Sequence, residues 1–179
     1  MGSALLERKG ERVAFMTTKG FKDLLRIGNQ SRPKLFDLNI VRPDVLYQDV
    51  IEVDERVTIE DYQQDPWRED SVAKTLASLE NDLSLVKGRS NEVVRILKAP
   101  NEPEVLSDLQ DLYAQGYRSL AVCFAHSYTF PDHELLIERL AKAIGFTQIS
   151  LSSQLLPMIK VRCRRRHASA ITKFQVDDI

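Results

Sequence analysis

The stretch Ser119–Ala125, with the sequence SLAVCFA, most constrains what this chain can fold into, because it is continuously apolar after its first residue. A strand with one wet face alternates apolar and polar side chains, whereas a strand covered on both faces does not. Both faces of a sheet are usually covered when helices connect parallel strands. The segment therefore predicts an inner strand of a parallel sheet.

The sequence on either side of this strand has the pattern of helices. Asn101 is a suitable N-cap, with Pro103 in the first turn and Glu104 at the capping-box position, and Gly116 ends that helix. A second helix begins near Pro131, ends at Gly145 and leads into a strand at 147–151. This order of helix, strand, helix and strand implies that the two strands pair in parallel and are connected by a right-handed crossover. The predicted class is α/β, with a mixed, partly parallel sheet and flanking helices.

The first half of the chain adds three predicted strands. They lie at 12–17, at 48–57, where Ile51 and Val53 alternate with acidic residues, and at 91–98. A short helix follows the first strand and is closed by Gly28. The segment 58–85 is polar and irregular, and we interpret it as a variable insertion. It contains one predicted helix, with apolar residues at helical spacing: Val72, Leu76, Leu79 and Leu83.

Composition excludes several classes of protein. The net charge of −1 gives no reason to expect a nucleic acid or a membrane surface as partner. No apolar run reaches the roughly 18 residues needed to span a bilayer. The start of the sequence lacks the apolar core of a signal peptide, and two cysteines make no disulfide framework. A cytoplasmic globular protein is the expectation.

Two polar segments follow predicted strands, where open parallel sheets bind their ligands. The first is Thr17, Thr18, Lys19 and Gly20, at a helix start that favours an anion such as a phosphate. The second contains His126 and Ser127, candidate residues of a substrate cleft. Each segment has a structural alternative, since both also suit a turn or a helix cap.

Other chemistry has little support in the sequence. His126 and His133 are separated by a helix start, so we predict no metal site, and Cys123 is interpreted as a small buried apolar residue. The cluster of arginines between Arg162 and Arg166 has no aromatic interleaving, and a solvated tail explains it better than a nucleic-acid site. No P-loop, dinucleotide fingerprint or nucleophile elbow is present. Physical reasoning alone predicts an α/β domain with a candidate anion site.

Several segments resemble a known family. The sequence ALLERKGERVAFMTTKGFKDLLRIGNQSRPKLFDL resembles the amino-terminal region of the hydantoinase A and 5-oxoprolinase family, particularly the eukaryotic ATP-dependent 5-oxoprolinases. VLYQDVIEVDERV, SLAVCFAHSYTFPDHE and GFTQISLSSQLLPMIK are similar to later blocks in the same order. The resemblance covers about 4–160 and is weakest over 58–85, which defines one family-like domain followed by a divergent, arginine-rich tail at 161–179.

The resemblance implies a fold of the actin-like, sugar-kinase type (ribonuclease H-like), whose nucleotide cleft is built by two α/β halves. It implies an enzyme that hydrolyses 5-oxo-L-proline to L-glutamate with ATP, in cytosolic glutathione turnover. ATP would phosphorylate the ring amide, and Mg²⁺ would accompany the nucleotide.

The departures from the family imply an incomplete enzyme. The family's glycine-rich phosphate motif, its second nucleotide half and its hydrolase region are not matched by this sequence, and after Lys160 the similarity is lost. We therefore expect a fragment that is inactive alone. The alternative is a non-catalytic interaction module that forms a homo-oligomer or associates with a full-length homologue through an open sheet edge.

Overall fold

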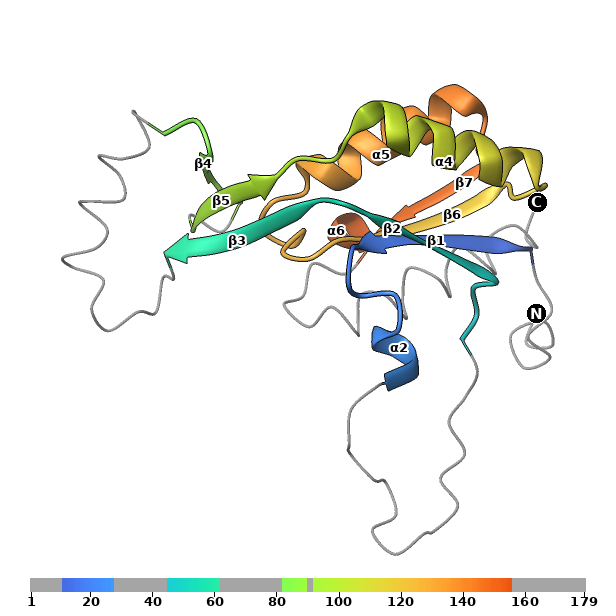
Figure 1. Cartoon of the computed structure of the whole chain (residues 1–179), viewed down its shortest axis with the longest axis horizontal. Helices are drawn as coiled ribbons and strands as arrows, with labels where there is room; N and C mark the ends of the chain where they lie inside the picture. Colours follow the sequence, from blue (N-terminus) through green and yellow to red (C-terminus); the bar gives the residue numbers. More distant parts are fainter. Residues whose placement is uncertain (1–10, 28–44, 62–81, 90–91, 156–179) are drawn as a thin grey trace, which may run out of the picture.

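The computed structural model describes residues 11–27, 45–61, 82–89 and 92–155 of the chain. Its centre is a parallel sheet with the order β2-β1-β6-β7 (Figure 1). The four strands are β1 (Val13–Thr18), β2 (Asp49–Val53), β6 (Ser119–Cys123) and β7 (Gln148–Leu151). The predicted α/β class and the parallel pairing around 119–125 are confirmed.

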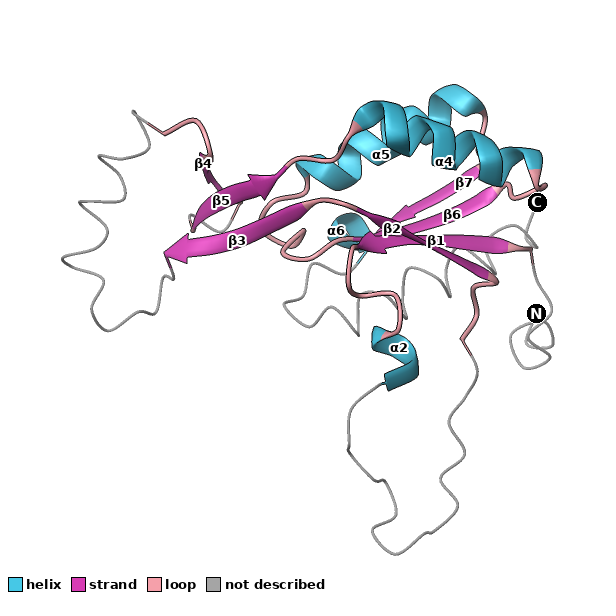
Figure 2. Cartoon of the chain, viewed as in Figure 1, coloured by secondary structure: helices cyan, strands magenta, loops and turns pink. Residues whose placement is uncertain are grey.

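Two helices cover one face of this sheet, α4 (Glu102–Ala114) and α5 (Asp132–Ile144) (Figure 2). Gly116 and Gly145 follow them with φ of 90° and 112°, conformations that glycine adopts without steric cost and that stop each helix. Asn101 is the N-cap of α4, but its side chain makes no capping bond and lies 3.5 Å from the Glu104 carboxylate. The predicted capping box is therefore wrong, although the helix begins where expected.

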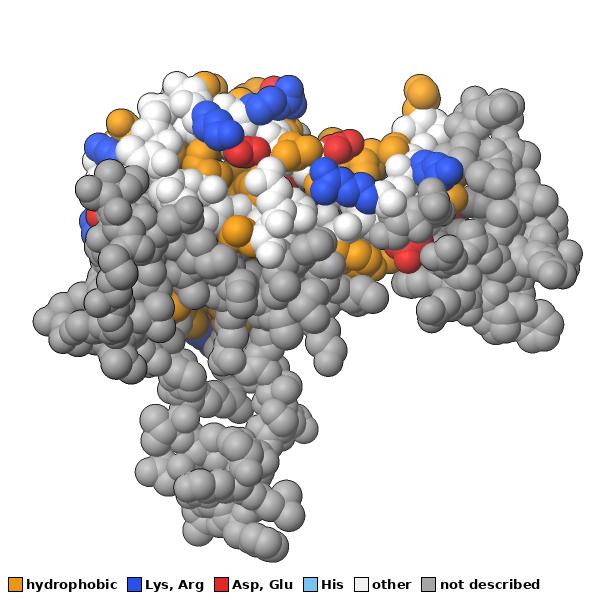
Figure 3. All heavy atoms as spheres, turned by 180° about the vertical axis from the view of Figure 1, so that it is seen from behind, with side chains coloured by type: hydrophobic (Ala, Val, Ile, Leu, Met, Phe, Trp, Pro, Cys, Tyr) orange, Lys and Arg blue, Asp and Glu red, His pale blue; other side chains and the backbone are white. Residues whose placement is uncertain are grey.

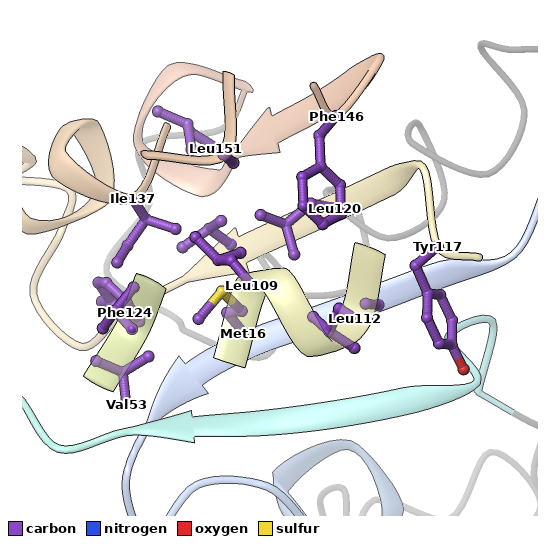
Figure 4. Close-up of a cluster of buried hydrophobic side chains, with 14 residues drawn as sticks. Met16, Val53, Leu109, Leu112, Tyr117, Leu120, Phe124, Ile137, Phe146 and Leu151 are labelled. Carbon is purple, nitrogen blue, oxygen red and sulfur yellow. The ribbon is translucent and has the colours of Figure 1, made fainter. Parts of the chain in front are cut away.

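The main core lies between these helices and the sheet (Figure 4). Side chains from all four parallel strands meet side chains from both helices there, and a buried leucine, isoleucine or phenylalanine contributes about 1.5–3 kcal/mol on leaving water. The residues labelled in Figure 4 are Met16, Val53, Leu109, Leu112, Tyr117, Leu120, Phe124, Ile137, Phe146 and Leu151.

The opposite face of the sheet is also buried. Phe15 stacks on Tyr47 with ring centroids 5.2 Å apart, and Val13, Ala121 and Cys123 complete this second cluster. Because β1 and β6 place buried side chains on both faces, their sequences show no polar alternation. Leu25, in the short helix α2 (Leu24–Ile27), packs against the same cluster.

A second, antiparallel sheet adjoins the first and has the order β3-β5-β4. Its strands are β3 (Arg56–Asp61), β4 (Leu85–Lys87) and β5 (Val93–Lys98). The single strand predicted at 48–57 is wrong, because β2 and β3 belong to different sheets and are separated by Asp54 and Glu55. The apolar alternation has the same phase on both sides of this junction and is interrupted only at Glu55, so the sequence pattern does not show a change of sheet.

The segment 58–85 is not irregular throughout, since strands occupy both of its ends. Most of the helix predicted there lies outside the described residues, and Leu83 lies in an exposed turn. Arg95 in β5 makes ion pairs of 2.9 Å with Glu60 in β3 and with Asp82, which precedes β4. The Arg95 guanidinium is the main cause of a lowered pKa at Glu60, and at Asp82 it adds to hydrogen bonds from Ser84.

On the side facing away from the view of Figure 1, lysine, arginine and acidic side chains alternate with apolar ones over the described surface (Figure 3). Leu97 in β5 is exposed as a single apolar residue, which is normal for a protein surface. Among the described helices, none is long and apolar enough to cross a membrane.

Candidate functional site at the carboxyl ends of the parallel strands

The two predicted polar segments lie side by side. Thr17 pairs with Cys123 in the register of β1 and β6, so the residues that follow these strands leave the sheet as neighbours. The Thr17 hydroxyl donates to the Cys123 carbonyl at 3.1 Å, and the Ala125 N–H donates to Thr18 Oγ1 at 2.9 Å. Parallel pairing therefore brings 17–20 and 125–127 to one edge of the sheet, as strand-end reasoning predicts.

Thr18 begins a buried chain of hydrogen bonds that the sequence analysis did not anticipate. Because the Ala125 N–H can only donate, Thr18 Oγ1 accepts from it, and the hydroxyl hydrogen goes to Glu55 Oε1. The other carboxylate oxygen, Glu55 Oε2, lies 2.7 Å from His133 Nδ1. The Glu55 side chain is completely buried, whereas 10% of the His133 side chain is exposed. A carboxylate in the junction between the two sheets thus binds β1 and α5 together.

Glu134, the next residue along α5, forms a second buried centre. Its Oε1 accepts from the Phe124 N–H at 2.9 Å and from the Ser152 hydroxyl at 2.6 Å, and its Oε2 accepts from the Ser153 N–H at 2.9 Å. These donors belong to the end of β6 and to the short helix α6 (Ser152–Leu155). One carboxylate therefore fixes the ends of two neighbouring strands.

Lys19 and Gly20 lie at the exposed rim of the site. Lys19 Nζ is 3.3 Å from Asp54 Oδ2, and Lys98 Nζ is 2.7 Å from the same oxygen. Hydrogen bonds from Lys98 and Lys19 hold the pKa of Asp54 below its usual range.

Glu52 Oε1 accepts the Gly20 N–H at 2.8 Å and the Lys22 N–H at 3.2 Å. The backbone N–H groups predicted to bind an anion therefore bind the Glu52 carboxylate instead.

His126 and Ser127 lie in the turn after β6. His126 adopts a left-handed conformation, with φ of 57°, and its carbonyl accepts the N–H groups of Thr129 and Phe130 at 3.1 and 3.0 Å. The buried Ser127 hydroxyl is 3.1 Å from the Ser152 hydroxyl, which connects it to the Glu134 centre. These contacts shape the turn, and a role of His126 and Ser127 toward substrate stays a prediction.

The described residues can be compared with what a nucleotide and its magnesium ion need. In this conformation the Gly20 and Lys22 N–H groups already have a carboxylate acceptor, so they do not fit a phosphate oxygen. Within the described ranges, no group of three or more His, Cys, Asp or Glu residues is arranged to hold a metal ion. The phosphate site at Thr17–Gly20 stays a prediction.

Sequence reasoning missed Glu55, His133 and Glu134 as members of the site. The residues on α5 could have been found, because His133 and Glu134 share the inward face with the buried Ile137 and Ala141 at helical spacing. Polar residues on an apolar face require partners, which is a signal for a buried network. Glu55 carries a similar signal, since it falls in phase with the apolar Val53 and Val57, but its partners depend on a separation of two strands that the sequence does not show.

Solved structures share this fold. The ATP-dependent caprolactamase from Pseudomonas jessenii matches 98% of this chain and 21% of its own, with a TM-score of 0.68 and 15% sequence identity. An acetone carboxylase in its nucleotide-free form matches 97% of this chain and 22% of its own, with a TM-score of 0.61 and 16% identity. At these identities the likeness establishes a shared fold.

The sequence then defines the family. The model of the hydantoinase/oxoprolinase N-terminal region matches residues 1–145, and the chain belongs to this family. Proteins named 5-oxoprolinase are similar to it: that of Saccharomyces cerevisiae is 50% identical over 92% of the chain, and that of Dictyostelium discoideum is 51% identical over 88%. The chain spans about 12% of the length of these relatives. The resemblance stated from the sequence is confirmed.

Proposed function

We propose that this chain is the counterpart of the amino-terminal region of an ATP-dependent 5-oxoprolinase, the enzyme class that opens the lactam of 5-oxo-L-proline to L-glutamate. The observation that carries the proposal is the identity of 50–51% to two proteins named 5-oxoprolinase, over roughly nine-tenths of the chain. Cytosolic glutathione turnover, a requirement for ATP and a requirement for Mg²⁺ belong to the same proposal.

In this proposal the carboxyl end of the parallel sheet forms part of the parent enzyme's cleft. It supplies Thr17, Thr18, Lys19 and Gly20 on one side and His126 and Ser127 on the other. The buried Glu55 and Glu134 centres support it by fixing the strand ends from which these residues project. The domain from 4 to 160 is the unit that would carry this role.

We further propose that the chain alone does not hydrolyse 5-oxo-L-proline, because it spans about 12% of the relatives that bear the name. The test is a pair of assays for glutamate release with ATP and Mg²⁺. The purified chain should release none. A chimera of the Saccharomyces cerevisiae enzyme, in which residues 4–160 of this chain replace the matched segment, should release glutamate.

A version of the yeast enzyme that lacks the segment is the matched control and should be inactive. A folded chimera without activity would contradict the assignment to this enzyme. Glutamate release by the chain alone would contradict its inactivity. Association with an intact homologue, the alternative expected from the sequence, would be detected as co-purification of the two proteins.

A further inference from the structure

Glu55 and His133 form a carboxylate–histidine pair. One ring nitrogen, Nδ1, faces the carboxylate, and the other, Nε2, does not. Glu55 Oε1 receives the Thr18 hydroxyl hydrogen, so Oε2 is the oxygen that faces His133 Nδ1 at 2.7 Å. A carboxylate that accepts from Nδ1–H leaves the lone pair of a neutral imidazole on Nε2. The structure therefore selects one tautomer of His133.

The environment of the ring keeps it in this orientation. Phe130 contacts the imidazole edge-on, with ring centroids 5.1 Å apart, and Glu55 is held in turn by Thr18. Within the described residues, His133 Nε2 has no hydrogen-bond partner. Since Glu55 is sealed from solvent and 10% of the His133 side chain is not, the imidazole is the more accessible member of the pair.

The location is that of a ligand-binding group. His133 lies in the first turn of α5, directly after the turn that follows β6, at the carboxyl edge of the parallel sheet. Glu134 beside it is fully engaged by three donors and offers nothing to a ligand. Asp132 is exposed and is not bonded to the pair. His133 is thus the group in this turn that is both oriented and reachable.

We propose that His133 Nε2 accepts the proton of a small cyclic amide, with Glu55 as its positioning residue; the identity of the ligand rests on the proposed function. The lactam N–H bond breaks and its proton moves to Nε2. The electron pair of that bond forms a C=N bond, and the C=O π pair moves onto the carbonyl oxygen. The products are an imidazolium, stabilised by the Glu55 carboxylate, and a cyclic imidate anion, whose negatively charged oxygen is a stronger nucleophile than the oxygen of the neutral amide.

The first experiment tests the pair on the full chain, without any assay of activity. Nitrogen–proton correlation spectra should show the neutral Nδ1–H tautomer at His133. Diethyl pyrocarbonate, which modifies unprotonated imidazole, should label His133 in the folded chain. In the variant Glu55→Gln, which removes the carboxylate that faces Nδ1, the share of the Nδ1–H tautomer at His133 should fall, with His126 as the internal reference. Observation of the Nε2–H tautomer in the unsubstituted chain would overturn the proposal. Labelling of His133 only after unfolding of that chain would overturn it as well.

The second experiment tests the ligand. 5-Oxo-L-proline should protect His133 from diethyl pyrocarbonate, and the N-methylated compound, which lacks the N–H group, should not. Equal protection by both compounds, or by neither, overturns the lactam assignment. In the yeast chimera, His133→Gln should lower kcat more than it raises KM. An inactive chimera with the native histidine counts against the proposed function, whereas an active chimera indifferent to His133→Gln counts against this inference.

Discussion

The two buried glutamates of this domain, Glu55 and Glu134, lie at the same end of the parallel sheet but have different surroundings. Glu134 accepts two backbone N–H groups and one serine hydroxyl, all from the ends of β6 and the start of α6. Glu55 accepts a threonine hydroxyl and faces an imidazole, and no backbone donor contacts its carboxylate in the described residues. One carboxylate is held mainly by backbone N–H groups, whereas the other is connected to a histidine.

This difference separates a structural role from a functional one. Backbone N–H groups at the ends of secondary structure need acceptors, and Glu134 satisfies two that would otherwise be buried without one. Glu55 accepts no backbone N–H group in the described residues, so the fold has less need of it. A buried carboxylate that orients a partly exposed imidazole is the arrangement that proton-transfer sites use.

The largest expected effect is that of Glu134→Ala. The substitution leaves the Phe124 N–H, the Ser153 N–H and the Ser152 hydroxyl buried without their acceptor. Each such donor costs about 1–3 kcal/mol, so we expect a loss of about 3–5 kcal/mol in the free energy of unfolding, measured by urea titration. The matched control is Glu138→Ala on the same helix, which removes a surface pair with Lys142 and should cost about 0.5 kcal/mol or less. Similar losses in both variants would show that Glu134 does not fix the strand ends.

Glu55→Leu should destabilise the fold less, by about 2–3 kcal/mol, because only a hydroxyl and one imidazole nitrogen lose an acceptor. Adding His133→Phe should recover part of this loss, since it removes the imidazole nitrogen that Glu55→Leu leaves without an acceptor. The free energies of unfolding of the two single variants and the double variant form a cycle that measures the coupling. A coupling near zero would mean that the two side chains do not interact in solution.

The sequence predicts the central half of this fold well, and the reason is local. The helices α4 and α5 and the strand β6 carry their own signals, in the apolar stripe, the terminal glycines and the unbroken apolar run of SLAVCFA. The site was predictable to the extent that parallel strands align their carboxyl ends, which places Thr18 beside Ala125. For the Glu55 centre the sequence shows only a polar residue in the apolar phase between Val53 and Val57, because the partners of Glu55 depend on the change of sheet between β2 and β3.

Thr18→Val tests the connection between the Glu55 centre and the strand ends. Valine keeps the shape of threonine but leaves the Ala125 N–H without its acceptor, which should cost about 1–2 kcal/mol. Thr17→Val is the matched control next to it in β1. That change removes a donor to the Cys123 carbonyl and leaves no N–H unpaired, so it should cost about 0.5 kcal/mol. Thermal or urea unfolding of both variants decides the comparison, and a larger loss at Thr17 would contradict it.

The smallest expected effect belongs to Asp54, the exposed carboxylate next to Glu55 in the junction between the sheets. Hydrogen bonds from Lys98 and Lys19 lower its pKa in the folded chain. A carboxyl group with a lowered folded pKa binds fewer protons in the folded state than in the unfolded state, so it adds stability above its unfolded pKa of about 3.9. That contribution should decline as the pH falls through the folded pKa.

Asp54→Asn should therefore reduce stability slightly at neutral pH and have no effect at the acidic end of the titration. The free energy of unfolding, measured for both proteins from pH 7 down to the acid limit of folding, gives the difference. Because Lys19, Lys98 and Asp54 are all exposed to solvent, added salt should shrink that difference. A difference that persists in concentrated salt would mean that Asp54, like Glu134, acts through a bond that solvent does not screen.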